Sequence, residues 1–126
     1  MEFLEIVDAS IPSAELQVLK IGELDKYCSE INNIVNVETV NRAKIYCGWG
    51  EFFVERQLIK GGVRFSLPEC PNALAWTITT GFEPAPDKVI IHCTINRLEH
   101  DEDFIESIEL FVKSWKIGLE ALQLEE

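Results

Sequence analysis

The side chains that most often carry out catalysis or bind metals are few in this sequence: two histidines and four cysteines. His92 directly precedes Cys93, and neighbours on a strand point to opposite faces, so we do not expect a nucleophilic Cys–His pair. The cysteines are 19, 23 and 23 residues apart and lack the closely spaced pair that is typical of zinc sites. We therefore expect no metal or cofactor, and reduced, mostly buried thiols at Cys28, Cys47, Cys70 and Cys93.

Several acidic residues are close to His100 in the sequence, just before and inside a predicted C-terminal helix. Carboxylates can bind a divalent cation, but these do not follow the spacing of an EF-hand, and acids at a helix N-terminus stabilise the helix without any metal. An acidic surface also attracts basic proteins. The residues predicted to contact such a partner are Glu99, Asp101, Glu102, Asp103 and Glu106, with Trp49 and Tyr27 as apolar anchors.

Trp49 lies between Gly48 and Gly50, an arrangement that is typical of a bulge or a close approach of the backbone. Two interpretations remain open at this point. Trp49 is either an exposed anchor for a partner or a core residue around which the glycines let the chain bend.

Arg56 falls in register with the apolar residues of a predicted strand, so it points to the apolar face unless a bulge at Gly50 shifts the register. A buried arginine must be paired, and Glu106 and Glu109 are candidate partners. If the domain has a ligand pocket, its polar groups are expected to be Arg56, His92 and Tyr46. Other bases of the middle section are expected on the outer face of the sheet, paired with local acids.

Two sections of the chain have clear periodicity. From Phe104 to Leu122 apolar residues recur every three or four positions, which predicts an amphipathic helix over about 102–122. The middle section alternates apolar and polar residues and contains the turn signal Gly61-Gly62, which is typical of a tight hairpin. It predicts four strands, at 51–59, 63–67, 74–79 and 89–95.

The first third of the chain has a weaker pattern. Residues 3–7 are expected to form a short strand. Leu24, Tyr27 and Ile31 follow helical spacing and predict a helix over about 23–35. Residues 37–47 fit either a helix or a strand.

Together these elements predict one α+β domain over residues 1–126. An antiparallel β-meander of about four or five strands is packed by helices, including the long C-terminal amphipathic helix, and Trp76 and Trp115 are expected to meet in the core. The 126 residues are 47% hydrophobic, enough for a single core, and carry a net charge of -11, which disfavours binding to nucleic acid. We expect a cytoplasmic protein, because we find neither a signal peptide nor a membrane span.

The sequence has no glycine-rich phosphate loop and no nucleophile elbow, so an enzyme is not the favoured reading. We expect a small acidic binding protein, of the immunity or inhibitor type, that occludes a basic toxin or nuclease. The alternative is a small-molecule-binding or enzymatic domain with a pocket between the sheet and its helices. A secretion chaperone or adaptor is a further alternative, and a homodimer would also suit the apolar stripe of the last helix.

Overall fold

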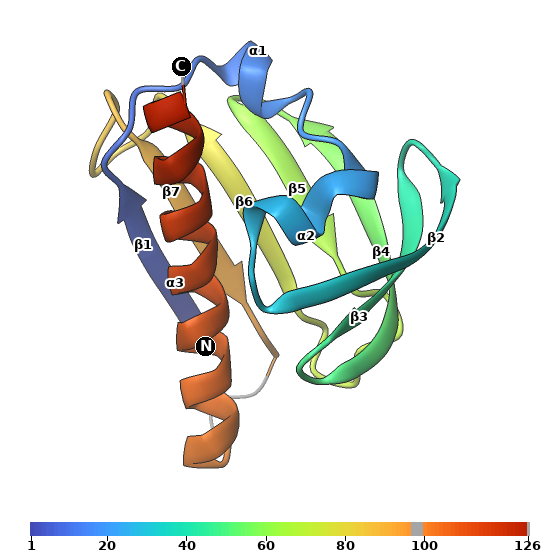
Figure 1. The fold of residues 1–126 in the computed structure, drawn as a ribbon. Coiled ribbons are helices and arrows are strands. Elements are labelled where there is room, and N and C mark those ends of the chain that lie inside the picture. The colour runs from blue at the N-terminus through green and yellow to red at the C-terminus, as the bar shows by residue number, and fades with distance from the viewer. Residues whose placement is uncertain (97–99, 126) are drawn as a thin grey trace.

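A computed structural model describes residues 1–96 and 100–125 of the chain. Seven strands form one antiparallel sheet, and the helical segments lie on one of its faces (Figure 1). The elements follow one another as β1 (Glu2–Val7), α1 (Ser13–Leu16), the 3-10 helix η1 (Ile21–Glu23), α2 (Leu24–Tyr27), β2 (Ile31–Thr39), β3 (Arg42–Cys47), β4 (Gly50–Ile59), β5 (Gly62–Ser66), β6 (Ala75–Thr80), β7 (Val89–Thr94) and α3 (Glu102–Glu125).

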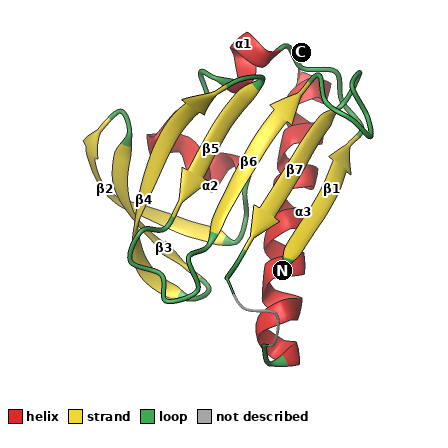
Figure 2. Cartoon of the chain, turned by 180° about the vertical axis from the view of Figure 1, so that it is seen from behind, coloured by secondary structure: helices red, strands yellow, loops and turns green. Residues whose placement is uncertain are grey.

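The strands lie in the order β1-β7-β6-β5-β4-β3-β2. From β2 to β7 each strand pairs with the next one along the chain, as a meander does, while β1 pairs with β7, the last strand. Seen from behind, the strands lie in front of α3 (Figure 2). The α+β class and the helical covering of one face are therefore as expected, but the sheet has seven strands rather than four or five.

The four strands of the middle section and the strand at 3–7 are confirmed, as is the C-terminal helix, which extends to Glu125. The helix expected over 23–35 is wrong. Only Glu23, the last residue of η1, and the single turn of α2 are helical there, and β2 begins at Ile31. Residues 37–47, which fitted either state, belong to strands: the end of β2, a turn and β3.

Aromatic side chains fill the space between the sheet and α3. Trp76 of β6 and Trp115 of α3 meet as expected, with ring centroids 6.2 Å apart. Phe65 stacks on Trp76 at 5.6 Å, and Phe111 meets the same ring edge-on at 4.9 Å. All four rings are fully buried, so this part of the interior is packed core.

Candidate functional site

An apolar groove of about 510 Å³ opens between residues 18–23 and the hairpin formed by β2 and β3. Three valines line it although they are 67%, 48% and 76% exposed: Val18 on one wall, and Val37 and Val40 on the other. Exposed apolar side chains that face each other across a groove differ from scattered ones, because a ligand there removes several of them from water at once. The groove is therefore the candidate site.

The first wall is a segment of chain that the core holds firmly. Leu16, Leu19 and Ile21 are buried, so the segment is anchored at three points, while Val18 between them points outward. The side-chain amide of Gln17 also donates a hydrogen bond to the carbonyl of Ile59 on β4, at 3.0 Å. The second half of this wall is the 3-10 helix η1, and these contacts position the first half, which has no regular secondary structure.

Arg56 of β4 completes the lining and ties the two walls together. Its Nε donates to the carbonyl of Leu19 at 3.0 Å, and Nη2 donates to the carbonyl of Gln17. On the other side Nη1 donates to Oδ1 of Asn41 at 3.1 Å, at the tip of the β2–β3 hairpin. The backbone N–H of Arg56 also donates to the carbonyl of Asn41, at 2.9 Å.

Of the two alternatives for Arg56, the structure shows the one in which it points to the inner face, because it lies opposite the buried Phe65 in the register of β4 and β5. Its expected pairing with Glu106 or Glu109 is wrong. Among the residues that the structure describes, no carboxylate lies within 4.0 Å of this guanidinium, which bonds to two carbonyls and one amide instead.

The other charges of the groove are Lys20 and Glu23. Glu23 already has partners, since it accepts a hydrogen bond from Tyr27 Oη at 3.1 Å and lies 4.0 Å from Lys26 Nζ. Burial of Tyr27, together with its hydrogen bond to Glu23, raises the pKa of Tyr27 to about 12, so this phenol stays a donor at neutral pH. The groove lining therefore has two cations, Arg56 and Lys20, and one carboxylate, Glu23, although the net charge of the protein is -11.

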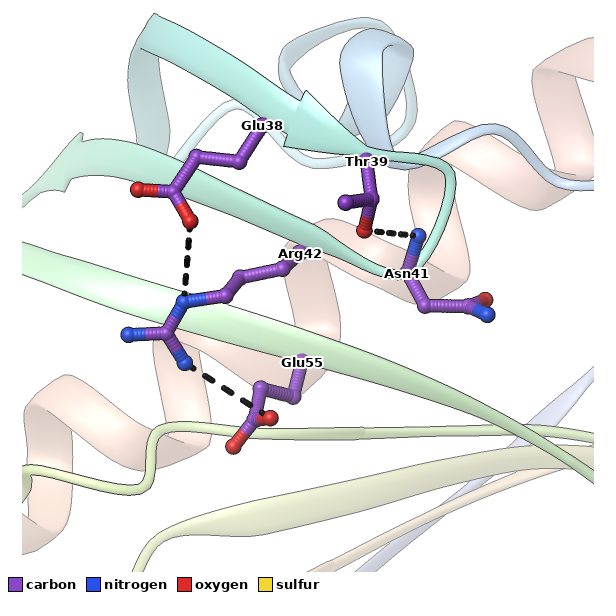
Figure 3. Close-up of polar contacts among 5 residues, drawn as sticks. All are labelled: Glu38, Thr39, Asn41, Arg42 and Glu55. Carbon is purple, nitrogen blue, oxygen red and sulfur yellow. Dashed lines mark hydrogen bonds and ion pairs between the residues drawn. The ribbon is translucent and has the colours of Figure 1, made fainter.

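Ion pairs on the outer face brace the hairpin that forms the second wall (Figure 3). Arg42 lies between two strands, with Nε 3.1 Å from Glu38 Oε2 and Nη1 3.6 Å from Glu55 Oε2. At the tip, the backbone N–H of Asn41 donates to Oγ1 of Thr39 at 3.1 Å. Arg42 is thus paired with local acids, as expected, and so are Lys44 with Glu51 and Lys88 with Asp8.

The pocket expected between the sheet and the helices, with Arg56, His92 and Tyr46 together, is not what the structure shows. His92 lies on the outer face, where Nε2 is 3.2 Å from Glu2 Oε1. Tyr46 is exposed on β3, opposite Glu51. Only Arg56 lines the groove, because the aromatic core occupies the space where the pocket was expected.

The two expected anchors belong largely to the core. Trp49 is half-buried beside Phe111, with ring centroids 5.1 Å apart, and its Nε1 donates to Ser107 Oγ at 2.8 Å. Tyr27 is buried and stacks on Trp115 at 6.1 Å. Trp49 thus packs against the core while staying partly exposed, which lies between the two interpretations.

The acids predicted to meet a partner are exposed where the structure describes them: Asp101, Glu102, Asp103 and Glu106. Glu99 lies outside the described residues. A hollow of about 380 Å³ lies beside them, between β1 and α3, where the carboxylates of Glu5, Glu106 and Glu109 accompany the single cation Lys113.

The four cysteines are free thiols, and all but the half-buried Cys70 are buried. Within the described ranges no three histidine, cysteine or acidic side chains come close enough to hold a metal ion. The same ranges contain no helix with the length and apolar character needed to cross a membrane.

Sequence reasoning missed most of the groove. Val18, Val37, Val40 and Asn41 are not among the residues that the sequence predicts for a site. No local pattern in the sequence separates these exposed valines from buried ones.

No family model matches the chain, and no curated protein matches it. Solved structures of similar shape do exist. The protein XoxI from Bacillus cereus has a TM-score of 0.68 at 11% identity, covering 98% of this chain and 95% of that one. An uncharacterised protein from Bacillus thuringiensis has a TM-score of 0.61 at 13% identity, with 99% and 98% covered. A START superfamily protein from Mycobacterium smegmatis has a TM-score of 0.62 at 8% identity, with 98% and 97% covered.

At these identities the likeness extends to the fold alone, and it covers the whole arrangement from β1 to α3. The chain thus shares with these three proteins a fold in which an antiparallel sheet is covered by a long C-terminal helix. Function has to be argued from the groove itself.

Proposed function

We propose that this protein binds a small, largely apolar molecule in the groove between residues 18–23 and the β2–β3 hairpin. The observation that carries the proposal is the groove itself, in which Val18, Val37 and Val40 stay exposed around a hydrogen-bonded Arg56. A volume of about 510 Å³ falls in the range of small-molecule sites. Walls that are fixed before binding lower the entropic cost of taking up a ligand.

Alkyl alcohols from hexanol to dodecanol test the proposal, with affinity measured by calorimetry. Each methylene that enters the groove strengthens binding by up to about 0.8 kcal/mol, which is about fourfold in Kd, until the groove is full. A series in which Kd does not change with chain length, or in which no alcohol binds, contradicts the proposal.

The chain provides a matched pair of variants for the same experiment. Val37 and Val35 lie on the same strand and are 48% and 46% exposed, but only Val37 lines the groove. Val37→Asp is expected to weaken alcohol binding at least about tenfold, because a carboxylate must then be desolvated. Val35→Asp is expected to bind as the unmodified protein does, and equal losses in both variants would count against the groove.

A basic protein partner is a second candidate, favoured by the acidic hollow between β1 and α3. Glu5, Glu106 and Glu109 border it together, and further exposed acids lie at the start of the helix. Such a surface steers a basic partner by charge. A pull-down at low and high salt, with Glu106→Lys as the altered bait, tests this role, because charge-steered binding weakens in both cases.

A further inference from the structure

We propose that the ligand of the groove carries a carboxylate, and that Arg56 together with the apolar walls selects an amphipathic acid. This inference rests on the proposed function and adds the chemical class of the ligand. It assigns the apolar part of the ligand to the valines and the anionic end to the guanidinium.

Arg56 is held in place by the protein. Three of its N–H groups donate to Gln17, Leu19 and Asn41, which come from both walls. A guanidinium has five N–H groups, so two remain without a protein acceptor among the described residues. A carboxylate has two oxygens and pairs well with such a planar, fixed donor.

Among the described residues, the charge of Arg56 also has no counter-ion. No described carboxylate lies within 4.0 Å of it, although the chain has twice as many acids as bases, 22 against 11. A half-buried cation that has hydrogen-bond acceptors but no counter-ion loses part of its hydration without gaining the energy of an ion pair. An anion that binds here therefore gains more than it would at an exposed, paired arginine.

The other charged residues of the groove also favour an anionic ligand. Lys20 adds a second cation, while Glu23 is already bonded to Tyr27 and close to Lys26. The acids of the adjoining hairpin and strand are also engaged, since Arg42 pairs with both Glu38 and Glu55. Within the described part of the chain no carboxylate pairs with Arg56 or Lys20, so a cationic ligand would be repelled by both.

The test compares three ligands with the same chain: decanoate, decanol and decylammonium. With the unmodified protein, decanoate is expected to bind at least about tenfold more tightly than decanol, and decylammonium more weakly than either. If decanoate and decanol bind equally, the groove still binds apolar molecules but the carboxylate inference is wrong. If none of the three binds, the proposed function fails as well.

A separate measurement tests whether Arg56 is the residue that binds the carboxylate. The NMR signal of the Arg56 Nε–H is expected to shift when decanoate is added and to shift much less with decanol, in protein that carries no substitution. In Arg56→Gln the preference for decanoate over decanol is expected to be lost, while Lys20→Gln keeps most of it. A preference that survives Arg56→Gln and disappears in Lys20→Gln would overturn the role of Arg56.

Arg56→Gln also removes hydrogen bonds that position the walls, so its folding must be compared with that of the parent by circular dichroism and thermal unfolding. Arg56→Lys serves as the second variant, since it keeps the charge and loses the planar donor. The expected result is an intermediate preference, and a preference as large as that of the parent contradicts recognition by a guanidinium.

Discussion

Nη1 of Arg56 donates a hydrogen bond to Oδ1 of Asn41 at 3.1 Å, so the inner face of β4 is bonded to the tip of the hairpin between β2 and β3. The two residues are also joined through their backbones, because the Arg56 N–H donates to the Asn41 carbonyl at 2.9 Å. The second wall of the groove is therefore fixed at its free end.

We expect Asn41→Ala to loosen this wall without unfolding the protein. The lost hydrogen bond is exposed, so the free energy of unfolding should fall by about 1 kcal/mol or less. Amide hydrogen exchange at residues 37–42 should become faster, while the strands of the core keep their protection. Asn36→Ala on the same hairpin is the control, and equal exchange in the two variants would show that the Arg56 contact does not hold the tip.

The tryptophans of the interior differ in whether their N–H groups have partners. Trp49 Nε1 donates to Ser107, whereas Nε1 of Trp76 and of Trp115 has no acceptor among the described residues. Benzothienylalanine has the shape of tryptophan without the donor. We expect it to stabilise the protein by up to about 1 kcal/mol at position 115 and to destabilise it by about 1 kcal/mol at position 49.

Urea unfolding of the two substituted proteins measures both changes on one scale. Destabilisation at position 115 would mean that the buried N–H has an acceptor after all, such as an internal water molecule.

At Gly118 the helix α3 lies close to the backbone of α2. A Cβ at this position would lie 1.8 Å from the carbonyl oxygen of Tyr27 and 2.7 Å from its carbon, and both are backbone atoms. Alanine favours helices by about 1 kcal/mol over glycine, yet we expect Gly118→Ala to destabilise the protein by about 2 kcal/mol or more, because the helix must move. Gly48→Ala, whose Cβ meets nothing within 4 Å, should change the melting temperature little.

Because two of its thiols are buried, the free energy of unfolding of the protein is expected to fall at alkaline pH. Burial raises the pKa of Cys28 and of Cys93 from 9.0 to about 12. The unfolded chain therefore loses these protons first, so this contribution to stability is complete below pH 9 and is lost as the pH rises towards 12. Urea midpoints measured across this interval should fall steadily, and a midpoint that does not change would contradict the burial of the two thiols.

The same burial predicts the order of chemical labelling. Cys70 is half-buried and should react first with a thiol reagent at neutral pH, whereas the three buried cysteines should react only as the protein opens. Cys70→Ser should remove the fast phase alone.

Sequence patterns predicted the parts of the fold in which the periodicity is regular. The stripe from Phe104 to Leu122 and the alternation of the middle strands gave α3 and β4 to β7 nearly to the residue. The pattern misled us at β2 for a physical reason. Its pairing with β3 shifts register three times, between Ile31 and Asn33, between Ile34 and Asn36, and between Val37 and Thr39. Each shift breaks the alternation, so the strand loses its period of two and resembles a helix.

The candidate site was predictable only in part. The register of β4 placed Arg56 on the inner face, since this depends on neighbours in the same strand. Its partners could not be found in that way, because Gln17, Leu19 and Asn41 bond through backbone carbonyls and one amide. The groove was missed because an exposed valine has no sequence signature that separates it from a buried one.

The pairing of β1 with β7 determines when the fold can be completed. Phe3 lies opposite Cys93, so the strand that is synthesised first can pair only after almost the whole sheet has been made. The meander from β2 to β7 joins neighbours in sequence and can assemble stepwise. Before β1 pairs with β7, β1 is an unpaired strand with apolar side chains and β7 is an open edge of the sheet. An unpaired strand together with an open edge favours exchange of strands between copies of the chain. Molecular chaperones that recognise extended apolar segments would find their target in residues 2–7.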